Sequence, residues 1–499
     1  MKVLSKSYII FLFCGLGVSS CADKWEDHIG DVDSQKNLYE VVQENTQFSA
    51  FAGLLEQSGY ADDLKASKNY TLIIPTNEAI DAVKANYNFS DTAVLRSFVG
   101  YHIINSIYNV NETTDTVRAQ NFRGKYVEFT RGAFDEVVPT SRNVTAGNGI
   151  YHVVPTALKP LQSVFAFVMT NFPDLEQMKG VLSFDTVYNE GGRITIHNNG
   201  VWYTQVRRHM TREDRKITYF VVDDEYYNAE YDKLRPYHYT SYAEDGDRPD
   251  STTTFFTKRN LLRDFIVEGE LDGQDLQQDL LSVAGTKFRV DAADIISTHK
   301  TSNGRVYRVR KLDVALADRI KELKVFGNQP IGFRQNDKGN NIYYRNKRDL
   351  NGELYDDIEI HGHGVTAFYA KYRLNDAAVV RYKVYARAIM GLTGDPQTTT
   401  FTQLVQFLDP TLTAANEVDL YKRPVVNNFL DANDTRMIFV VTPRNHDEVY
   451  LGEVTQDEFG RLPLLVMSTG TGTPPATGVI ANGSGPIILE YLRFVPILP

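Results

Sequence analysis

The sequence contains little cysteine and little tryptophan, with two of each in 499 residues. So few thiols exclude the disulfide framework that holds small secreted domains together. Basic charge is also scarce, because 53 Lys and Arg stand against 63 Asp and Glu and give a formal net charge of -10. An acidic chain lacks the cationic surface that nucleic acid requires, so no nucleic-acid partner is expected.

Motifs that mark common enzyme and cofactor sites are absent as well. The sequence has no Gly-x-Ser-x-Gly, no phosphate-binding loop, no Cys-x-x-Cys and no His-Glu-x-x-His. We therefore expect a protein that binds without catalysing a reaction and that needs no cofactor.

The first 20 residues have the pattern of an export signal. Lys2 and Lys6 precede an apolar run over residues 8–18, which is too short to span a bilayer as a mature helix. Small residues then lead to Cys21. This order resembles a bacterial lipoprotein signal, and the resemblance implies cleavage before Cys21 and acylation of its thiol. Residues 1–20 are thus the predicted signal, and a lipid anchor is expected to hold the mature chain on a membrane.

Residues 21–36 form an acidic stretch that includes Asp23, Glu26 and Asp27. This stretch is similar to the start of surface lipoproteins of the Bacteroidetes type. In that group an acidic stretch after the acylated cysteine accompanies display on the cell exterior. The resemblance implies an outer-membrane protein that faces outward, and a solvated tether that faces the periplasm is the alternative.

A strand followed by a capped helix is predicted near residue 75. The apolar run over 72–74 favours a buried strand, and Pro75 ends it because proline cannot donate to a central ladder. Thr76 is a natural N-cap for the helix that follows. Upstream, apolar residues over 38–59 recur at helical spacing and predict a helix that ends at Gly59.

Further along, Asn148-Gly149 predicts a hairpin turn before a strand over 150–154. Together with Tyr101-His102, these blocks resemble the fasciclin domain in both motif and order. The resemblance covers residues 37–161 and implies a compact α+β module used in adhesion and binding. His102 and His152 belong to the motifs, and we expect them to be hydrogen-bonded near the core.

Residues 162–318 contain a weaker copy of the same order. The run 218–225 parallels 71–78 without the proline, and Asp223 is expected to cap the following helix. The run 303–309 parallels 148–154. We interpret residues 162–318 as a degenerate second fasciclin domain.

The second copy has extra residues between 226 and 258, where tyrosines are frequent. Pro236 argues against one long helix, and the segment is expected to be a binding loop. Tyrosine rings offer stiff, amphipathic contact area. Tyr237, Tyr239 and Tyr242 are therefore candidate ligand-binding residues. The alternative is that these rings pack back onto their own domain.

From 325 to 499 short alternating strands separated by turns predict an all-β sandwich. The closing run 487–496 is similar to the last strand of galactose-binding-like jelly rolls. The resemblance implies a carbohydrate-binding-module-like domain, and a purely structural sandwich is the alternative. The tyrosines available for a glycan platform are Tyr343, Tyr344, Tyr385 and Tyr421.

His361 and His363 are the strongest metal candidates, because alternate residues of a strand share one face. Gly362 and Gly364 instead indicate a turn, and no distant third ligand is evident. No metal site is therefore predicted.

The sequence as a whole predicts a lipid-anchored outer-membrane protein. Its expected architecture is two α+β fasciclin-like domains followed by an all-β jelly-roll sandwich. By analogy with fasciclin lipoproteins that accompany glycan uptake, we expect a polysaccharide or an outer-membrane transporter component as partner. Cell adhesion is one alternative. A glycoside hydrolase with a carboxylate pair such as Asp223-Asp224 is the other.

Overall fold

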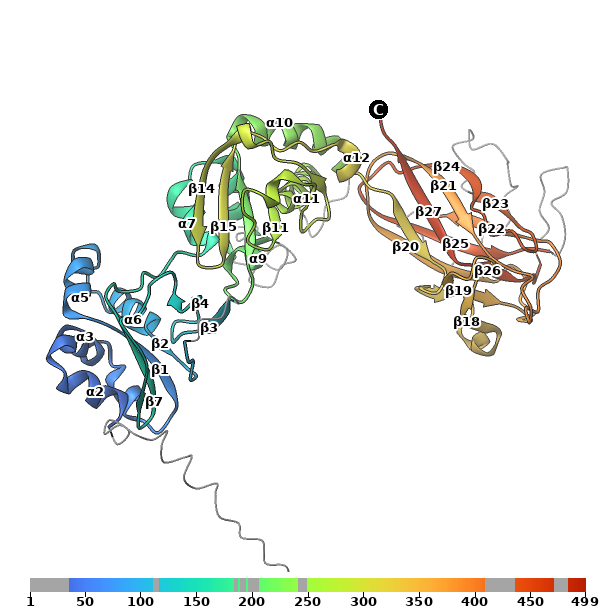
Figure 1. Cartoon of the computed structure of the whole chain (residues 1–499). Coiled ribbons are helices and arrows are strands. Elements are labelled where there is room, and N and C mark those ends of the chain that lie inside the picture. Colours follow the sequence, from blue (N-terminus) through green and yellow to red (C-terminus); the bar gives the residue numbers. More distant parts are fainter. Residues whose placement is uncertain are drawn as a thin grey trace, which may run out of the picture. The chain divides into compact units, whose positions relative to one another are not determined.

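The computed structural model describes most of the chain in two compact units, Met1–Ser163 and Val164–Pro499 (Figure 1). The described residues are 36–110, 116–183, 187–188, 194–195, 206–240, 249–408, 436–470 and 483–499. Cys21, the predicted signal, Tyr242 and Tyr421 lie outside these residues, as does the acidic tether apart from its last residue.

The first unit combines short helices with two small sheets. Its helices are α2 (Leu38–Glu44), η2 (Thr46–Phe48), α3 (Ser49–Ser58), α4 (Ala61–Lys65), α5 (Asn77–Val83), η3 (Lys84–Asn86) and α6 (Thr92–Tyr101). Its strands are β1 (Tyr70–Pro75), β2 (Ile103–Ile104), β3 (Val117–Gln120), β4 (Tyr126–Thr130), β5 (Ala133–Phe134), β6 (Ser141–Ala146) and β7 (Gly149–Val154). The sheets have the orders β2-β1-β7-β6 and β3-β4-β5, and β1 and β7 run parallel.

The strand and cap predicted around Pro75 are confirmed. All six residues of β1 are buried, and Pro75 is the last of them. The Thr76 side chain accepts a hydrogen bond from the Ala79 backbone N at 3.3 Å. The β6–β7 hairpin is also present, but it pairs Ala146 with Gly149. Its turn therefore lies one residue earlier than predicted, and the side chain of Asn148 serves another purpose described below.

The single helix predicted over 38–59 is wrong. Asn45 ends α2 with extended backbone (φ −92°, ψ 113°), and its side chain accepts a hydrogen bond from the Gln47 N at 2.9 Å. This local bond competes with a continuous helix and starts a new turn instead. The predicted end is confirmed, since Gly59 closes α3 in the left-handed conformation at φ 78°.

The second unit opens with a region whose four-stranded sheet has the order β11-β10-β15-β14. Its helices are α7 (Val164–Asn171), α8 (Glu176–Ser183), α9 (Arg208–Thr211), α10 (Asp224–Leu234), η5 (Arg235–His238), α11 (Pro249–Asp264), η7 (Asp275–Gln277), η8 (Ala292–Asp294) and α12 (Leu316–Arg319). Its strands are β8 (Val187–Tyr188), β9 (Ile194–Thr195), β10 (Ile217–Val221), β11 (Ile266–Glu268), β12 (Leu280–Leu281), β13 (Lys287–Phe288), β14 (Ile295–Thr301) and β15 (Gly304–Val309).

This sheet has the arrangement of the β1 sheet, strand for strand. The central pair β10–β15 is parallel and matches Ile217 with Gly304, as β1–β7 matches Tyr70 with Gly149. In both pairs a Cβ on the glycine would lie within 2.1 Å of the facing carbonyl oxygen, so only glycine allows the strands to approach.

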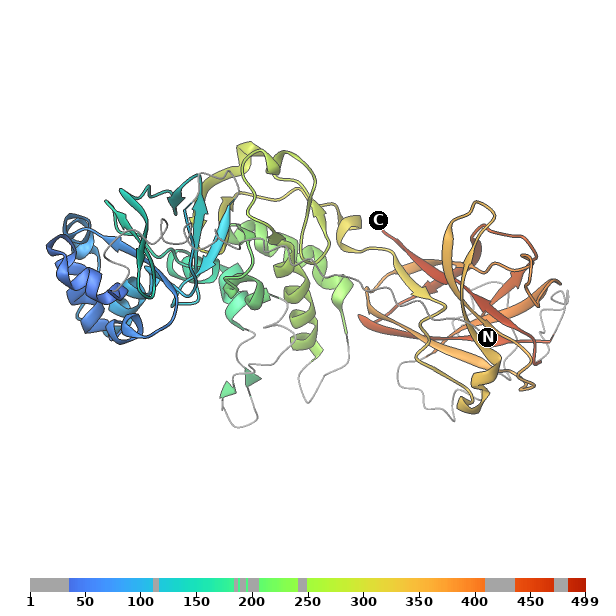
Figure 2. The same ribbon diagram turned by 60° about the horizontal axis from the view of Figure 1, so that its bottom comes forward.

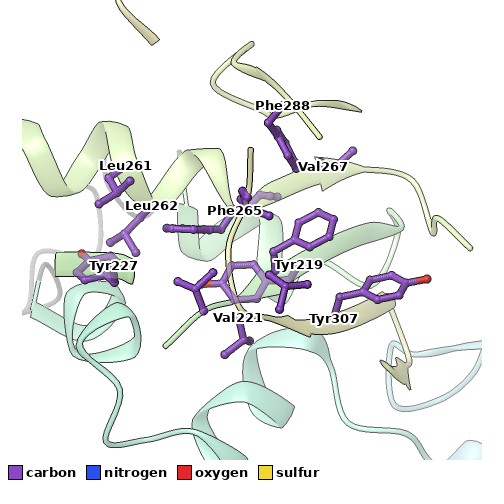
Figure 3. Close-up of a cluster of buried hydrophobic side chains, with 14 of the residues drawn as sticks. Tyr219, Val221, Tyr227, Leu261, Leu262, Phe265, Val267, Phe288 and Tyr307 are labelled. Atoms are coloured by element: carbon purple, nitrogen blue, oxygen red, sulfur yellow. The ribbon is translucent and has the colours of Figure 1, made fainter. Parts of the chain in front are cut away.

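Aromatic side chains fill the space on both sides of β10 (Figure 3). On one side Tyr219 packs in a cluster with Phe265 and with Tyr227 of α10. On the other side Phe220 contacts Phe288 and Tyr307, with ring centroids 5.5 and 5.8 Å apart. Strand alternation thus gives each side of the sheet its own aromatic contacts.

The loop predicted over 226–258 is wrong for the residues that the structure describes. Helix α10 continues into the 3-10 turn η5, and α11 occupies the segment after residue 248. Pro236 is tolerated because it lies at the start of η5, where its missing N–H costs little. Asp223 takes the N-cap position of α10 as expected, but its side chain makes no capping bond and accepts a hydrogen bond from Arg308 Nη2 at 2.8 Å instead.

Within the described residues, the rest of the second unit consists of strands and the 3-10 turn η9 (Asn336–Asn341). Its strands are β16 (Leu323–Phe326), β17 (Gly332–Phe333), β18 (Ile342–Arg348), β19 (Leu354–Ile360), β20 (Tyr369–Ala377), β21 (Arg381–Arg387), β22 (Phe401–Phe407), β23 (Arg436–Val441), β24 (Val449–Thr455), β25 (Gly460–Ser468), β26 (Ile487–Leu489) and β27 (Tyr491–Ile497). They form three sheets, β16-β27-β21-β24, β17-β20-β25-β22-β23 and β18-β19-β26.

The two larger sheets enclose one core, and Figure 2 shows their strands, yellow to red, in layers. Phe494 of β27 meets Phe407 of β22 across this core, with centroids 6.0 Å apart. The predicted last strand is interrupted: Glu490 separates β26 from β27, and its carboxylate pairs with Arg387 at 2.9 Å. Among the helices in the described part of the chain, none is both long and apolar enough to cross a membrane.

Candidate binding surface on the sandwich

Two of the predicted platform tyrosines lie on β18, an edge strand of the sheet β18-β19-β26. Tyr343 is 41% exposed, and its ring stacks on His361 with centroids 4.7 Å apart and planes 10° from parallel. Tyr344 is 59% exposed. As neighbours on a strand, the two side chains point to opposite faces, so they do not form one platform.

The face of β18 that carries Tyr343 also carries Arg345, which lies opposite Asp357 of β19. The Arg345 guanidinium bonds to both oxygens of Asp357, with Nε to Oδ1 at 2.8 Å, and to Glu359 Oε2. Lys347 bonds to Asp395, whose carboxylate lies 3.5 Å from Arg345. We call these five side chains the Arg345 cluster.

The Arg345 cluster is buried and has one more negative than positive charge when all its groups are ionised. The side chains of Asp357 and Glu359 are 0% and 2% exposed. Burial raises the pKa of both carboxyl groups, against the opposing effect of Arg345. Glu359 Oε1 has no hydrogen-bond partner. Since breaking a buried ion pair leaves a costly lone charge, the cluster holds the β18–β19 hairpin, and with it Tyr343, in one geometry.

Tyr237 and Tyr239, two of the tyrosines predicted as a ligand loop, lie at the junction between the helical region and the sandwich. The Tyr237 ring packs against the core of the helical region, and its carbonyl accepts a hydrogen bond from the Val379 N at 2.9 Å. The Tyr239 carbonyl accepts one from the Phe459 N at 2.7 Å. Tyr239 nevertheless keeps 51% of its surface exposed. The packing alternative therefore describes Tyr237, and Tyr239 remains available to a ligand.

Tyr385 of β21 packs between Tyr450 of β24 and Arg493 of β27. The ring centroids are 5.4 Å apart, and the Arg493 guanidinium lies 4.7 Å from the Tyr385 ring. Tyr450 is 52% exposed and forms a second aromatic surface of the sandwich. Tyr385 and Tyr343 belong to different sheets.

The two histidines of the metal hypothesis are engaged elsewhere. His363 Nε2 lies 3.1 Å from the Gly485 carbonyl, and its Nδ1 accepts a hydrogen bond from the Val365 N at 3.2 Å. Burial lowers the pKa of His363. Within the described ranges, no three His, Cys, Asp or Glu side chains are arranged to hold a metal ion.

His102 and His152 are core residues, as predicted. His102 Nδ1 lies 2.9 Å from the Phe98 carbonyl, and Nε2 accepts a hydrogen bond from the Leu158 N at 3.0 Å. His152 accepts one from the Asn143 N at 3.1 Å. Burial lowers the pKa of each imidazole to about 4.

Sequence reasoning missed the Arg345 cluster and the buried role of Asn148. Asn148 Oδ1 accepts a hydrogen bond from the Leu38 N at 2.8 Å, and Nδ2 donates to the carbonyls of Leu64 and Ala66 at 2.6 and 2.9 Å. A signal for the cluster was present, because basic residues at 345 and 347 and acidic residues at 357 and 359 alternate on two candidate strands. Only the strand register shows that they meet.

Two curated relatives each match part of this chain. Human (Homo sapiens) periostin is 24% identical over 137 residues, which is 26% of this chain and 16% of periostin. The fasciclin-like arabinogalactan protein CTB11 of Cercospora beticola is 30% identical over 96 residues, which is 19% of this chain and 25% of that protein. The matched part is thus at most a quarter of either relative.

Among solved structures, a FAS1 domain pair from the insect cell adhesion molecule fasciclin I matches with 15% identity and a TM-score of 0.24. The match covers 56% of this chain and all of that one. A family 35 carbohydrate binding module from Clostridium thermocellum matches with 10% identity and a TM-score of 0.20, over 36% of this chain and 99% of that one.

The family model of the fasciclin domain matches residues 46–160. That range contains β1 with its capped helix, the buried His102 and the β6–β7 hairpin. Residues 46–160 of this chain are therefore a fasciclin domain.

Proposed function

We propose that this protein is a lipid-anchored outer-membrane protein that binds a glycan without transforming it. The observation that carries the proposal is Tyr343, a half-exposed ring stacked on His361 beside the rigid Arg345 cluster. Sugars present an apolar face that stacks on aromatic rings and hydroxyl groups that bond to polar side chains. On the face of β18 that carries Tyr343, the ring offers the apolar contact, and the partly exposed side chains of Arg345 and Lys347 offer the polar ones.

The proposed architecture is two fasciclin domains and a carbohydrate-binding-module-like sandwich. The second fasciclin domain is supported by shared hydrogen bonds as well as strand order. Asn303 bonds to the Val164 N and to the Met210 and Arg212 carbonyls, as Asn148 does to its three partners. Thr71 and Thr218 likewise each donate to one carbonyl and accept from one backbone N–H.

The proposed location follows from residues 1–36 of the sequence. Signal cleavage before Cys21 and acylation of its thiol would hold the protein on the outer membrane, and the acidic stretch after it favours the cell exterior. There the partner would be a polysaccharide held for an outer-membrane transporter. A Cys21→Ser variant should move from the membrane fraction to the soluble fraction, and unchanged membrane recovery would contradict the anchor.

Glycan binding is tested with Tyr343→Ala on the mature chain. Affinity electrophoresis in xylan, mannan, pectin and dextran would show retardation by at least one polysaccharide. Removing the ring should weaken that binding about five- to tenfold, since one stacking contact contributes roughly 1 kcal/mol. Tyr450→Ala is the matched control, because Tyr450 is also an exposed sandwich tyrosine. Equal losses in both variants, or release of sugar from the bound polymer, would contradict the proposal.

Cell adhesion is the second candidate function, and the fasciclin domain at residues 46–160 favours it. On this reading the partner is a protein of a neighbouring cell or matrix. Cells that lack the protein would then lose attachment but grow normally on every polysaccharide, and Tyr343→Ala would leave attachment unchanged. Glycan retardation that depends on Tyr343 favours the first function instead.

A further inference from the structure

A cavity of about 200 Å³ lies within the second unit, where the helical region meets the sandwich. His238 and Arg319 line it from the helical region, and Tyr382 and Phe459 line it from the sandwich. An apolar cavity of about 150 Å³ holds a benzene molecule. This cavity therefore has room for a small organic molecule with a single ring.

The walls of the cavity are of two kinds. Leu234, Ile320, Leu323 and Phe459 provide apolar surface. Much of the remaining wall is polar and carries the cationic groups described next. A ligand that fits both surfaces has an apolar body and one polar end.

The charges around the cavity leave one positive charge in excess. Arg263, Arg319 and Lys321 line it together with Asp264 and Asp376. Asp264 pairs with Arg319 at 2.8 Å, and Asp376 pairs with Arg259 at 2.8 Å. Glu230 is a second partner of Arg319. Among the side chains that line the cavity, three cations thus face two carboxylates, so the polar end of the ligand is best matched by a single negative charge.

One buried donor in the cavity wall, on His238, lacks an acceptor. Arg259 Nε donates to Asn260 Oδ1 at 3.3 Å, which turns Asn260 Nδ2 toward His238 Nε2 at 2.8 Å. Because an amide N–H only donates, Nε2 is the acceptor and Nδ1 of the neutral ring carries the hydrogen. This Nδ1 has no hydrogen-bond partner, although the His238 side chain is only 3% exposed.

We propose that this cavity binds a small organic monocarboxylate with an apolar body. The carboxylate lies toward the side of His238, Arg319 and Lys321, and the body packs against the apolar wall. A monoanion cancels the excess charge, whereas phosphate carries more charge and no apolar body. The site is separate from the proposed glycan surface, because none of its lining residues belongs to β18 or β19.

Benzoate is the probe, and benzamide is its neutral counterpart of the same shape. Titration calorimetry of the mature chain should show saturable binding of benzoate at millimolar or lower concentration, and binding of benzamide at least tenfold weaker. Inorganic phosphate should not compete. Lack of saturable benzoate binding, equal binding of benzamide, or displacement by phosphate would each overturn the proposal.

Two variants locate the site. Lys321→Met removes one cavity cation and should weaken benzoate binding about tenfold, while Lys311→Met, a change at an exposed lysine that does not line the cavity, should leave it unchanged. Ala284→Leu fills cavity space without altering a charge and should abolish binding. Circular dichroism would confirm that each variant folds. Unchanged affinity in the folded Lys321→Met or Ala284→Leu protein would overturn the assignment.

Discussion

At the scale of single residues, the two fasciclin-motif histidines show how burial fixes a protonation state. Each ring has bonds that use its neutral form, and each has a folded pKa of about 4. The unfolded pKa is near 6.5. A depressed folded pKa means that the unfolded chain takes up protons first, so acid favours unfolding of the first unit.

Stability of the first unit should therefore fall as the pH decreases from about 6.5 toward 4. Between pH 7 and pH 5, protonation of His102 in the unfolded chain should lower the free energy of unfolding by about 2 kcal/mol. Urea unfolding of His102→Gln, compared with wild type at pH 7 and pH 5, would show a smaller pH dependence in the variant. Equal pH dependence in both proteins would contradict the assignment of this effect to His102.

Residue type alone did not show which partner a polar side chain chooses. Asp223 is of a residue type that favours the N-cap and lies at the N-cap position, yet its side chain pairs with Arg308. The first copy has Val153 at the position that corresponds to Arg308. The histidine environments were predicted correctly because the resemblance located them in known motifs. The bonding partners of Asn148 lie far from it in sequence, so no local pattern could indicate them.

At the scale of elements, the β6–β7 and β14–β15 hairpins share one hydrogen-bonding arrangement. In each, a buried asparagine just before the second strand of the hairpin accepts a hydrogen bond from the backbone N of the first residue of a helix. Its amide nitrogen donates to two backbone carbonyls of an earlier segment. Losing such a side chain leaves buried backbone groups without partners.

Asn148→Ala should destabilise the first unit, and Asn303→Ala the second, each by about 3 kcal/mol. Differential scanning calorimetry of the full chain would show which transition moves. Asn346→Ala, at an exposed position of β18, is the control and should change neither transition. If either Asn148→Ala or Asn303→Ala moved both transitions, the result would contradict the idea that each asparagine stabilises its own unit independently.

The Arg345 cluster should stabilise the β18–β19 hairpin in a way that depends on pH. Arg345→Met leaves buried carboxylates without their main cation and should destabilise the second unit by about 3–5 kcal/mol at pH 7. Without Arg345 the folded carboxyl groups would bind protons more readily than the unfolded ones, so the deficit should shrink as the pH decreases. Thermal unfolding at pH 7 and pH 4.5 measures this change, and a deficit that grows in acid would contradict it.

Much of the strand content was predictable, because β21 is marked by alternation and β23 by a continuous apolar run. In β21 the apolar positions are buried and the basic ones are exposed or half-buried. The helices within 226–258 were missed because polar and aromatic residues dominate α10 and Pro236 suggested a break. Tertiary packing of Tyr227 and Leu234 overrides that weak local signal.

At the scale of the whole molecule, the second unit joins unlike architectures through a dense junction. Phe459 of the sandwich packs edge-on against His238 and contacts Phe256, with both centroids 4.8 Å away. Backbone hydrogen bonds and the Arg259–Asp376 ion pair add to this contact. A buried aromatic contact of this size couples the unfolding of its two sides.

Phe459→Ala should therefore divide one calorimetric transition of the second unit into two, because the helical region and the sandwich would unfold separately. The expected loss of stability is about 3 kcal/mol. Phe326→Ala removes a ring that is 44% exposed and should leave a single transition. A single transition that only moves to lower temperature in Phe459→Ala would contradict the coupling.

The pairing of β16 with β27 also has a consequence for how the chain reaches its native state. Val325 of β16 pairs with Leu492 of β27, so the first strand of the sandwich finds this neighbour only after nearly the whole chain has been synthesised. Forming contacts between such distant positions has a large cost in loop-closure entropy, and this cost slows folding. A chain that crosses a membrane during export would thus complete this sheet only after translocation is almost finished.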